Sequence, residues 1–153
     1  MSNYNRREFI RLASAATLTT GVLGFPGLLL AAGPKVVVVG GGVGGCTAAK
    51  YLRKLDPRIQ VTLIEPKAAY TSCFMSNEVL SGDRSIDSIT FDYEGLRDHG
   101  VKIISDRVAA IDHEQKRVVT DGGEKLPFDA CVVSPGVDFK WDAIEGYDAE
   151  VAE

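Results

Sequence analysis

The sequence predicts an α/β fold in which a parallel β-sheet opens with a β–α–β unit and is followed by an antiparallel β-meander. Two apolar, β-branched runs, "KVVVV" and "QVTLI", flank a helical pattern, which is the order of a β–α–β unit. Short apolar runs separated by turn residues follow between residues 107 and 126, as in antiparallel hairpins. The 153 residues suffice for one domain of ordinary size.

The β–α–β unit is expected at the start of the fold. Lys35–Val39 reads as a strand buried on both faces, and Gly40–Gly45 forms the turn after it. Val43–Leu55 then reads as a helix that stops at Asp56-Pro57, because the residue before a proline avoids helical backbone. Gln60–Ile64 is the second buried strand.

The later elements are shorter. We expect an irregular segment over Lys67–Ile89 and a helix over Phe91–His99 that ends at Gly100. "DGG" at Asp121–Gly123 predicts a hairpin turn. The strands expected in this half are Val101–Ile104, Arg107–Asp112, Arg117–Thr120, Glu124–Leu126 and Ala130–Ser134.

Residues 1–32 read as an export signal rather than as part of the fold. Arg6 and Arg7 precede an apolar run, diluted by Gly, Thr, Ser and Pro, that closes with Ala31 and Ala32. This order is typical of a cleaved signal, and the paired arginines resemble the bacterial twin-arginine signal. We expect cleavage after Ala31 or Ala32, export to the periplasm and no stable membrane anchor.

Composition narrows the possible partners. The chain is 45% hydrophobic and 25% charged with a net charge of −4, so no basic surface of the kind that binds nucleic acid is expected. The cysteines include no C-x-x-C pair, and neither histidine has a second ligand at metal spacing. The sequence therefore predicts neither a nucleic-acid partner nor a metal site.

A glycine pattern in the first turn indicates a nucleotide-binding site. Gly40, Gly42 and Gly45 fit G-x-G-x-x-G between a strand and a helix, and Glu65 ends the next strand 20 residues after Gly45. In this dinucleotide fingerprint, the first glycine allows a tight turn, the second admits the diphosphate and the third lets the helix approach the strand. The backbone N–H groups at Val43-Gly44 and the helix dipole hold the diphosphate, and the acid accepts ribose hydroxyls.

The residues favour FAD as the dinucleotide. Glu65 would repel the 2′-phosphate of NADP. Soluble NAD stays in the cytoplasm, whereas a tightly bound flavin survives export in a folded protein, as the twin-arginine route allows. The Rossmann-like domain is therefore predicted to bind FAD.

Four stretches give the sequence a family resemblance, which covers residues 33–153. The four stretches are "KVVVVGGGVGG", "VTLIEP", "YTSCFMSNEVLSGDRSIDSI" and "FDACVVSPGVDFKWDAIEGYD". In them the sequence resembles the flavoprotein subunits of flavocytochrome c sulfide dehydrogenases, which are disulfide-reductase-like flavoproteins. The resemblance implies a periplasmic oxidoreductase that passes electrons from sulfide through FAD to a cytochrome c subunit. In that family the redox cysteines and a completing strand lie farther along the chain, so we expect residues 33–153 to be the amino-terminal part of a longer, FAD-binding protein.

Further contacts to FAD are expected outside the glycine turn. Loops at the carboxyl ends of strands line the crevice of such sheets. "FDACVVSPG" is similar to the second motif of two-dinucleotide-domain flavoproteins, with Ser134 in place of the usual Ala or Thr. Cys73 is either a neighbour of the flavin ring or an ordinary loop thiol. The remaining candidate contacts are Pro66, Lys67, Asn77, Val108 beside the adenine, and Gly136.

Two other functions remain open from the sequence. One is a sulfide:quinone or other FAD/NAD(P)-dependent oxidoreductase, which shares the fingerprint. The other is a truncated nucleotide-binding fragment without catalytic activity, because no redox cysteine pair is recognisable before Glu153.

Overall fold

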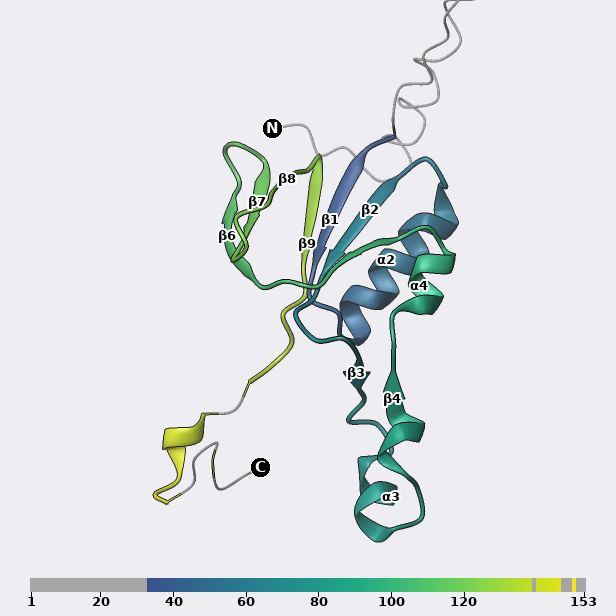
Figure 1. Ribbon diagram of the computed structural model, residues 1–153, viewed down its shortest axis with the longest axis vertical. Helices are drawn as coiled ribbons and strands as arrows, with labels where there is room; N and C mark the ends of the chain where they lie inside the picture. Colours follow the sequence, from purple (N-terminus) through teal and green to yellow (C-terminus); the bar gives the residue numbers. More distant parts are fainter. Residues whose placement is uncertain (1–32, 139, 147–149, 151–153) are drawn as a thin grey trace, which may run out of the picture. The chain divides into compact units, whose positions relative to one another are not determined.

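A parallel β-sheet forms the centre of the domain. The computed structural model describes residues 33–138, 140–146 and 150, so the predicted export signal lies outside the described residues. The sheet has four strands in the order β5-β2-β1-β9, all parallel (Figure 1). Its strands are β1 (Lys35–Val39), β2 (Gln60–Ile64), β5 (Lys102–Ile104) and β9 (Ala130–Val133). The predicted parallel sheet with its β–α–β start is confirmed.

The valine run of β1 is buried on both faces of the sheet. Val36 and Val38 pack with helix residues in one hydrophobic cluster, whereas Val37 packs in a second cluster with residues of the meander. Successive side chains of a strand point to opposite faces, so a strand covered on both sides must be apolar throughout. This explains why four consecutive valines stand ahead of the glycine turn.

Two helices cover one face of the sheet. Helix α2 (Val43–Leu55) has the predicted bounds and ends at Asp56. Helix α4 (Glu94–Asp98) is shorter than the predicted Phe91–His99. That prediction was wrong because Phe91 pairs with Tyr70 in a β-ladder, and the Asp92 carboxylate accepts the N–H of Glu94 at 3.0 Å, which starts the helix later.

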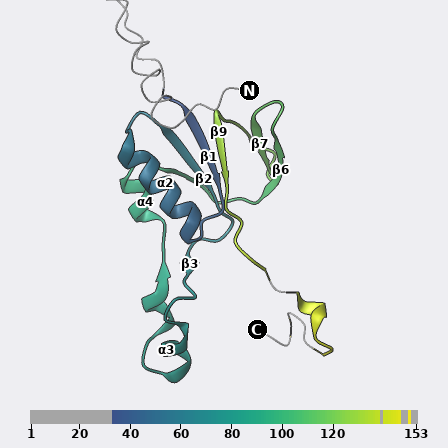
Figure 2. The same cartoon turned by 180° about the vertical axis from the view of Figure 1, so that it is seen from behind.

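Residues 67–91 form an arm that leaves the sheet at the carboxyl ends of its strands (Figures 1 and 2). The prediction of an irregular segment was wrong in part, because the arm contains short regular elements. They are β3 (Tyr70–Thr71), α3 (Ser76–Ser81), the 3₁₀ helix η1 (Ile86–Ile89) and β4 (Thr90–Phe91). Helix α3 ends at Gly82, whose φ of 85° is the left-handed conformation usual after a helix.

The meander covers the other face of the sheet. Its strands lie in the order β6-β7-β8 and are antiparallel, as predicted: β6 (Val108–Asp112), β7 (Arg117–Thr120) and β8 (Lys125–Pro127). The Asp106 carboxylate accepts N–H groups of Arg107 at 2.7 Å and Gly122 at 3.0 Å, which joins the start of β6 to the β7–β8 turn. A last 3₁₀ helix, η2 (Trp141–Ala143), follows β9. Within the described part of the chain, no helix is long and apolar enough to cross a membrane.

Candidate functional site

The predicted site lies at the carboxyl ends of β1, β2 and β9. The chain passes from β1 through α2 to β2, and β9 pairs with the opposite edge of β1, so the strand order reverses between β1 and β9. Such a reversal opens a crevice in which α/β proteins bind ligands. Two backbone hydrogen bonds extend the sheet into the turn: Gly40 N–H to Ile64 carbonyl at 3.0 Å and Ser134 N–H to Val39 carbonyl at 2.8 Å.

Gly40 and Gly45 are required by the fold itself. Gly40 has a φ of 99°, and a Cβ there would lie 2.1 Å from the carbonyl oxygen of Ser134. A Cβ on Gly45 would lie 1.9 Å from the carbonyl oxygen of Gly40. These two glycines therefore make the tight turn and the close approach of helix to strand that the fingerprint assigns to them.

The packing of the protein does not require a glycine at position 42. Gly42 is the N-cap of α2 with an ordinary φ of −76°, and a Cβ would find only the Tyr70 ring, at 3.8 Å. The following N–H groups, from Val43 and Gly44, belong to the first turn of a 13-residue helix and have no partner within the helix. The packing thus leaves room for a methyl group at the place where backbone donors and the helix dipole favour an anion.

Glu65 connects the glycine turn to the loop after β2. Its Oε2 accepts the Gly41 N–H at 2.7 Å and its Oε1 accepts the Lys67 N–H at 3.0 Å. Each carboxylate oxygen has a second lone pair, so both can still accept a ribose hydroxyl. The predicted ribose acceptor is therefore held in place by the backbone on both sides.

Two side chains outside the predicted set reach the same turn. The Tyr93 hydroxyl donates to the Gly41 carbonyl at 3.1 Å, and the Cys46 thiol donates to that oxygen at 3.0 Å. Burial, followed by the charge of Glu65, raises the pKa of Tyr93 to about 12. Burial and then Glu65 also raise the pKa of the Cys46 thiol. Both groups therefore stay protonated and remain donors near neutral pH.

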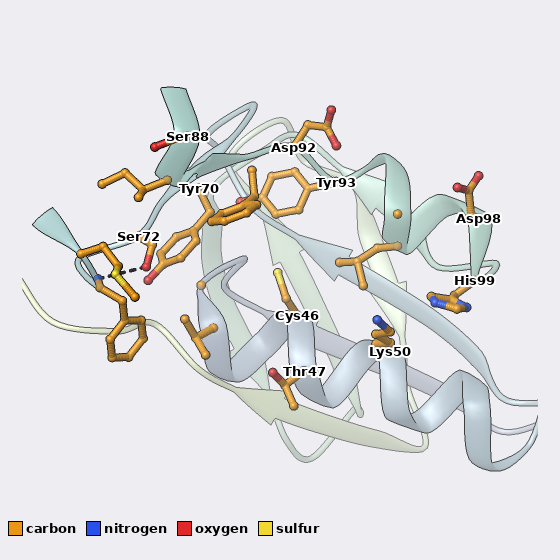
Figure 3. A pocket seen from close by; sticks show the side chains of 18 of the residues that line it. Cys46, Thr47, Lys50, Tyr70, Ser72, Ser88, Asp92, Tyr93, Asp98 and His99 are labelled. Carbon is orange, nitrogen blue, oxygen red and sulfur yellow. Dashed lines mark hydrogen bonds between the residues drawn. The ribbon is translucent and has the colours of Figure 1, made fainter. Parts of the chain in front are cut away.

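A cavity of about 850 Å³ adjoins the turn. In Figure 3, Cys46 and Lys50 project from α2 toward side chains of the arm and of the α4 region. Tyr70 and Ser72 of the arm form part of its wall, and the Ser72 hydroxyl accepts the N–H of Phe74 at 3.0 Å. Most of the wall is apolar, and its charged side chains are those of Lys50, Arg84, Asp92 and Asp98.

The other predicted contacts are dispersed. Pro66 lies between Glu65 and Lys67 in the loop that the carboxylate holds. Cys73 is exposed in the arm before α3, and Asn77 lies on α3; neither lines the cavity. Val108 begins β6 and packs against the meander-side cluster, and Gly136 follows β9 with a φ of 78°. The contacts of these residues with FAD remain predictions.

No pattern in the sequence points to Tyr93 or Gly41 as site residues. The fingerprint leaves the position of Gly41 free, and Tyr93 lies 52 residues farther along the chain. Nor does any spacing in the sequence indicate the hydrogen bond from the Cys46 thiol to the turn. Among the described residues, no group of His, Cys, Asp and Glu is placed to hold a metal ion.

The fold and the turn define an α/β domain of the Rossmann-like, dinucleotide-binding type. The model of the pyridine nucleotide-disulphide oxidoreductase family matches residues 34–152, and the chain belongs to that family. It is a family of FAD-binding oxidoreductases.

Several relatives are named for sulfide chemistry. The flavoprotein chain of sulfide dehydrogenase [flavocytochrome c] from Chlorobaculum thiosulfatiphilum is 67% identical over 45 residues, which is 29% of this chain and 94% of that sequence. Sulfide-quinone reductase from Aquifex aeolicus is 33% identical over 104 residues, 66% of this chain and 24% of the relative. A crystal structure of the sulfide:quinone oxidoreductase from that species superposes with a TM-score of 0.65 at 29% identity, covering 69% of this chain and 25% of the other. The chain thus spans about a quarter of the length of the Aquifex relative.

Proposed function

We propose that this domain binds FAD with the diphosphate over Gly42 and the start of α2. The observation that carries the proposal is the difference between Gly42 and its neighbours. Gly40 and Gly45 must be glycine for the protein's own packing, whereas a Cβ at Gly42 would meet only the Tyr70 ring. A glycine that the protein does not need is explained by a ligand that approaches the backbone closely.

Different groups of the chain bind the diphosphate and the ribose in the ADP half of FAD. The first-turn N–H groups of α2, at Val43 and Gly44, donate to the diphosphate, and the helix dipole favours its negative charge. The free lone pairs of Glu65 accept the adenosine ribose hydroxyls. When bound, the flavin supplies the ability to take up and release electrons. Contacts of Pro66, Lys67, Asn77, Cys73, Val108 and Gly136 with FAD belong to the same proposal.

A graded substitution tests the diphosphate position in the full-length protein. Gly42→Ala should weaken flavin binding at least about tenfold, and Gly42→Val should abolish it, because each added group occupies the space of the phosphates. Gly95→Ala is the matched control, since a Cβ there meets nothing within 4 Å and one at Gly42 meets only the Tyr70 ring, at 3.8 Å. The measurement is bound flavin absorbance together with the melting temperature. Full flavin occupancy in Gly42→Val would contradict the proposal.

For the complete protein, we propose oxidation of sulfide, with electrons passing through FAD to a cytochrome c. Two kinds of support exist: the high identity to a flavocytochrome c flavoprotein chain over 45 residues, and the similarity to sulfide-quinone reductase over 104 residues. The first relative favours cytochrome c as electron acceptor, and the second keeps quinone as the alternative.

The acceptor is decided by a direct comparison. Full-length protein supplied with sulfide should reduce a c-type cytochrome faster than a water-soluble ubiquinone analogue. The reverse order would replace the cytochrome proposal by the quinone reductase alternative. Failure to consume sulfide with either acceptor would exclude sulfide as the substrate while leaving the FAD site intact.

We also propose export to the periplasm by the twin-arginine route, on the basis of Arg6-Arg7 and the apolar run that follows. Replacing both arginines by lysine should leave the protein in the cytoplasm on cell fractionation. An unchanged periplasmic fraction would contradict this route.

A further inference from the structure

We propose that Tyr93 is a positioning residue of the dinucleotide site, which aims the backbone N–H of Gly42 at the diphosphate through the peptide group between Gly41 and Gly42. The inference rests on the proposed binding of FAD. It assigns a role in nucleotide binding to a side chain from the start of α4, outside the glycine fingerprint.

The geometry of one peptide group carries the inference. Tyr93 donates to the Gly41 carbonyl at 3.1 Å, and the Cys46 thiol donates to it at 3.0 Å. In a planar trans peptide, the carbonyl of one residue and the N–H of the next point in opposite directions. Holding the Gly41 carbonyl toward Tyr93 therefore turns the Gly42 N–H away from the core, to the side where the anion is expected.

The preceding peptide group is fixed as well. The Gly41 N–H belongs to the peptide between Gly40 and Gly41, and it donates to Glu65 at 2.7 Å. Tyr93 and Glu65 thus hold two consecutive peptide groups of the turn. A donor whose direction is set before the ligand arrives loses less entropy on binding, which is the basis of preorganisation.

The space around Gly41 is consistent with this arrangement. A Cβ on Gly41 would lie 2.5 Å from the Tyr93 hydroxyl and 2.6 Å from Cγ of Glu65. The fingerprint places no demand on this position, yet the two side chains that hold the turn leave no room for a methyl group. Gly41 is therefore needed for the hydrogen bonds that orient the turn, and Gly42 for the ligand.

The burial of Tyr93 supports a specific purpose for its hydroxyl. The residue is only 4% exposed and its ring packs in the helix-side cluster with Val38 and Leu63. A phenylalanine would fill the same space without the cost of burying a hydroxyl. The buried hydroxyl donates to the Gly41 carbonyl, so its hydrogen bond holds the glycine turn.

Tyr93→Phe in flavin-free full-length protein tests the inference. One lost hydrogen bond should weaken binding of FAD and of ADP about threefold to tenfold by calorimetric titration. Binding of adenosine, which lacks the diphosphate, should be unchanged. Tyr51→Phe makes the same chemical change at a 57% exposed position on α2 and should leave all three affinities unaltered.

The outcomes separate the inference from the proposed function. If the wild-type protein binds neither FAD nor ADP, the FAD proposal fails and the role of Tyr93 fails with it. If wild type binds them and Tyr93→Phe binds them equally well, only the role of Tyr93 is refuted. An equal loss for adenosine would show a general structural effect and would overturn the inference too. Should Tyr93→Phe fail to fold, Cys46→Ala removes the other donor and should give a smaller loss of about twofold, again confined to FAD and ADP.

Discussion

The glycine turn and the arm leave the same edge of the sheet but are stabilised in different ways. In the turn, Gly40 and Gly45 lie so close to neighbouring backbone carbonyls that neither position has room for a Cβ. The N–H of Gly41 donates to Glu65, and its carbonyl accepts from Tyr93. In the arm, residues 67–91, α3 has no buried residue, and Leu80 is 86% and Phe74 65% exposed.

This difference shows where conformational specificity is concentrated. The turn is fixed by steric exclusion and by part-buried hydrogen bonds and one buried hydrogen bond, from Tyr93, whose loss costs the desolvation of the groups involved. The arm is held by the two-residue ladder of β3 and β4, by the apolar side chains of Tyr70 and Ile89, and by surface interactions such as the Glu78–Arg84 ion pair. Segments with few buried apolar contacts open with low free energy. We therefore expect the turn to open only with global unfolding and the arm to open locally.

The largest predicted effect compares one glycine from each region. Gly45→Ala should lower the free energy of unfolding by about 3 kcal/mol or more, because its Cβ would overlap a backbone oxygen that cannot move alone. Gly82→Ala should cost about 1 kcal/mol, since that residue has a left-handed φ of 85° but open space around it. Urea unfolding of both variants measures the two values.

The two substitutions should also differ in their effect on flavin binding. Gly45→Ala should also reduce flavin binding, whereas Gly82→Ala should leave it unchanged. Equal destabilisation by the two substitutions would show that the turn is no more constrained than the arm.

The second prediction concerns alkaline pH and the turn. The folded pKa of Tyr93, about 12, lies above the ordinary value of 10.0, so the unfolded state releases its phenol proton first as pH rises. Stability from this group is complete below pH 10 and is lost as pH rises toward 12. The loss should reach about 1 kcal/mol between pH 9 and pH 11. Urea unfolding at both pH values should show it in wild type, and Tyr93→Phe should lack this component.

The fold was predictable where local signals and tertiary packing agree. The bounds of β1, α2 and β2 match the prediction residue for residue, because apolar runs, the glycine turn and Asp56-Pro57 mark each boundary locally. The arm and α4 were not predicted correctly, because the pairing of Tyr70 with Phe91 joins residues 21 positions apart and takes Phe91 out of the expected helix.

The candidate site was predictable to the same extent. The fingerprint glycines and Glu65 do meet at one edge of the sheet, as strand order requires. Tyr93 was missed because its contact with Gly41 depends on how α4 packs on the sheet, and no spacing in the sequence encodes that packing. The role of Cys46 was also not predictable, since a free cysteine behaves as a small buried hydrophobe with only a weak S–H donor, and its spacing does not distinguish packing from a hydrogen bond to the turn.

The smallest predicted effect tests whether the arm opens locally. Arg84 donates to Glu78 at 2.7 Å and joins the end of the α3 segment back onto the helix, with both side chains partly exposed. Arg84→Ala should therefore cost only about 0.5 kcal/mol, the usual value of a surface ion pair. Hydrogen exchange should accelerate in residues 76–86 and stay unchanged in β1 and β2. Arg97→Ala, which removes a comparable 2.8 Å pair with Glu94 on α4, is the matched control and should leave exchange in the arm unaltered. If Arg84→Ala accelerated exchange equally in the sheet, the arm and the turn would unfold as one unit and the contrast between them would be lost.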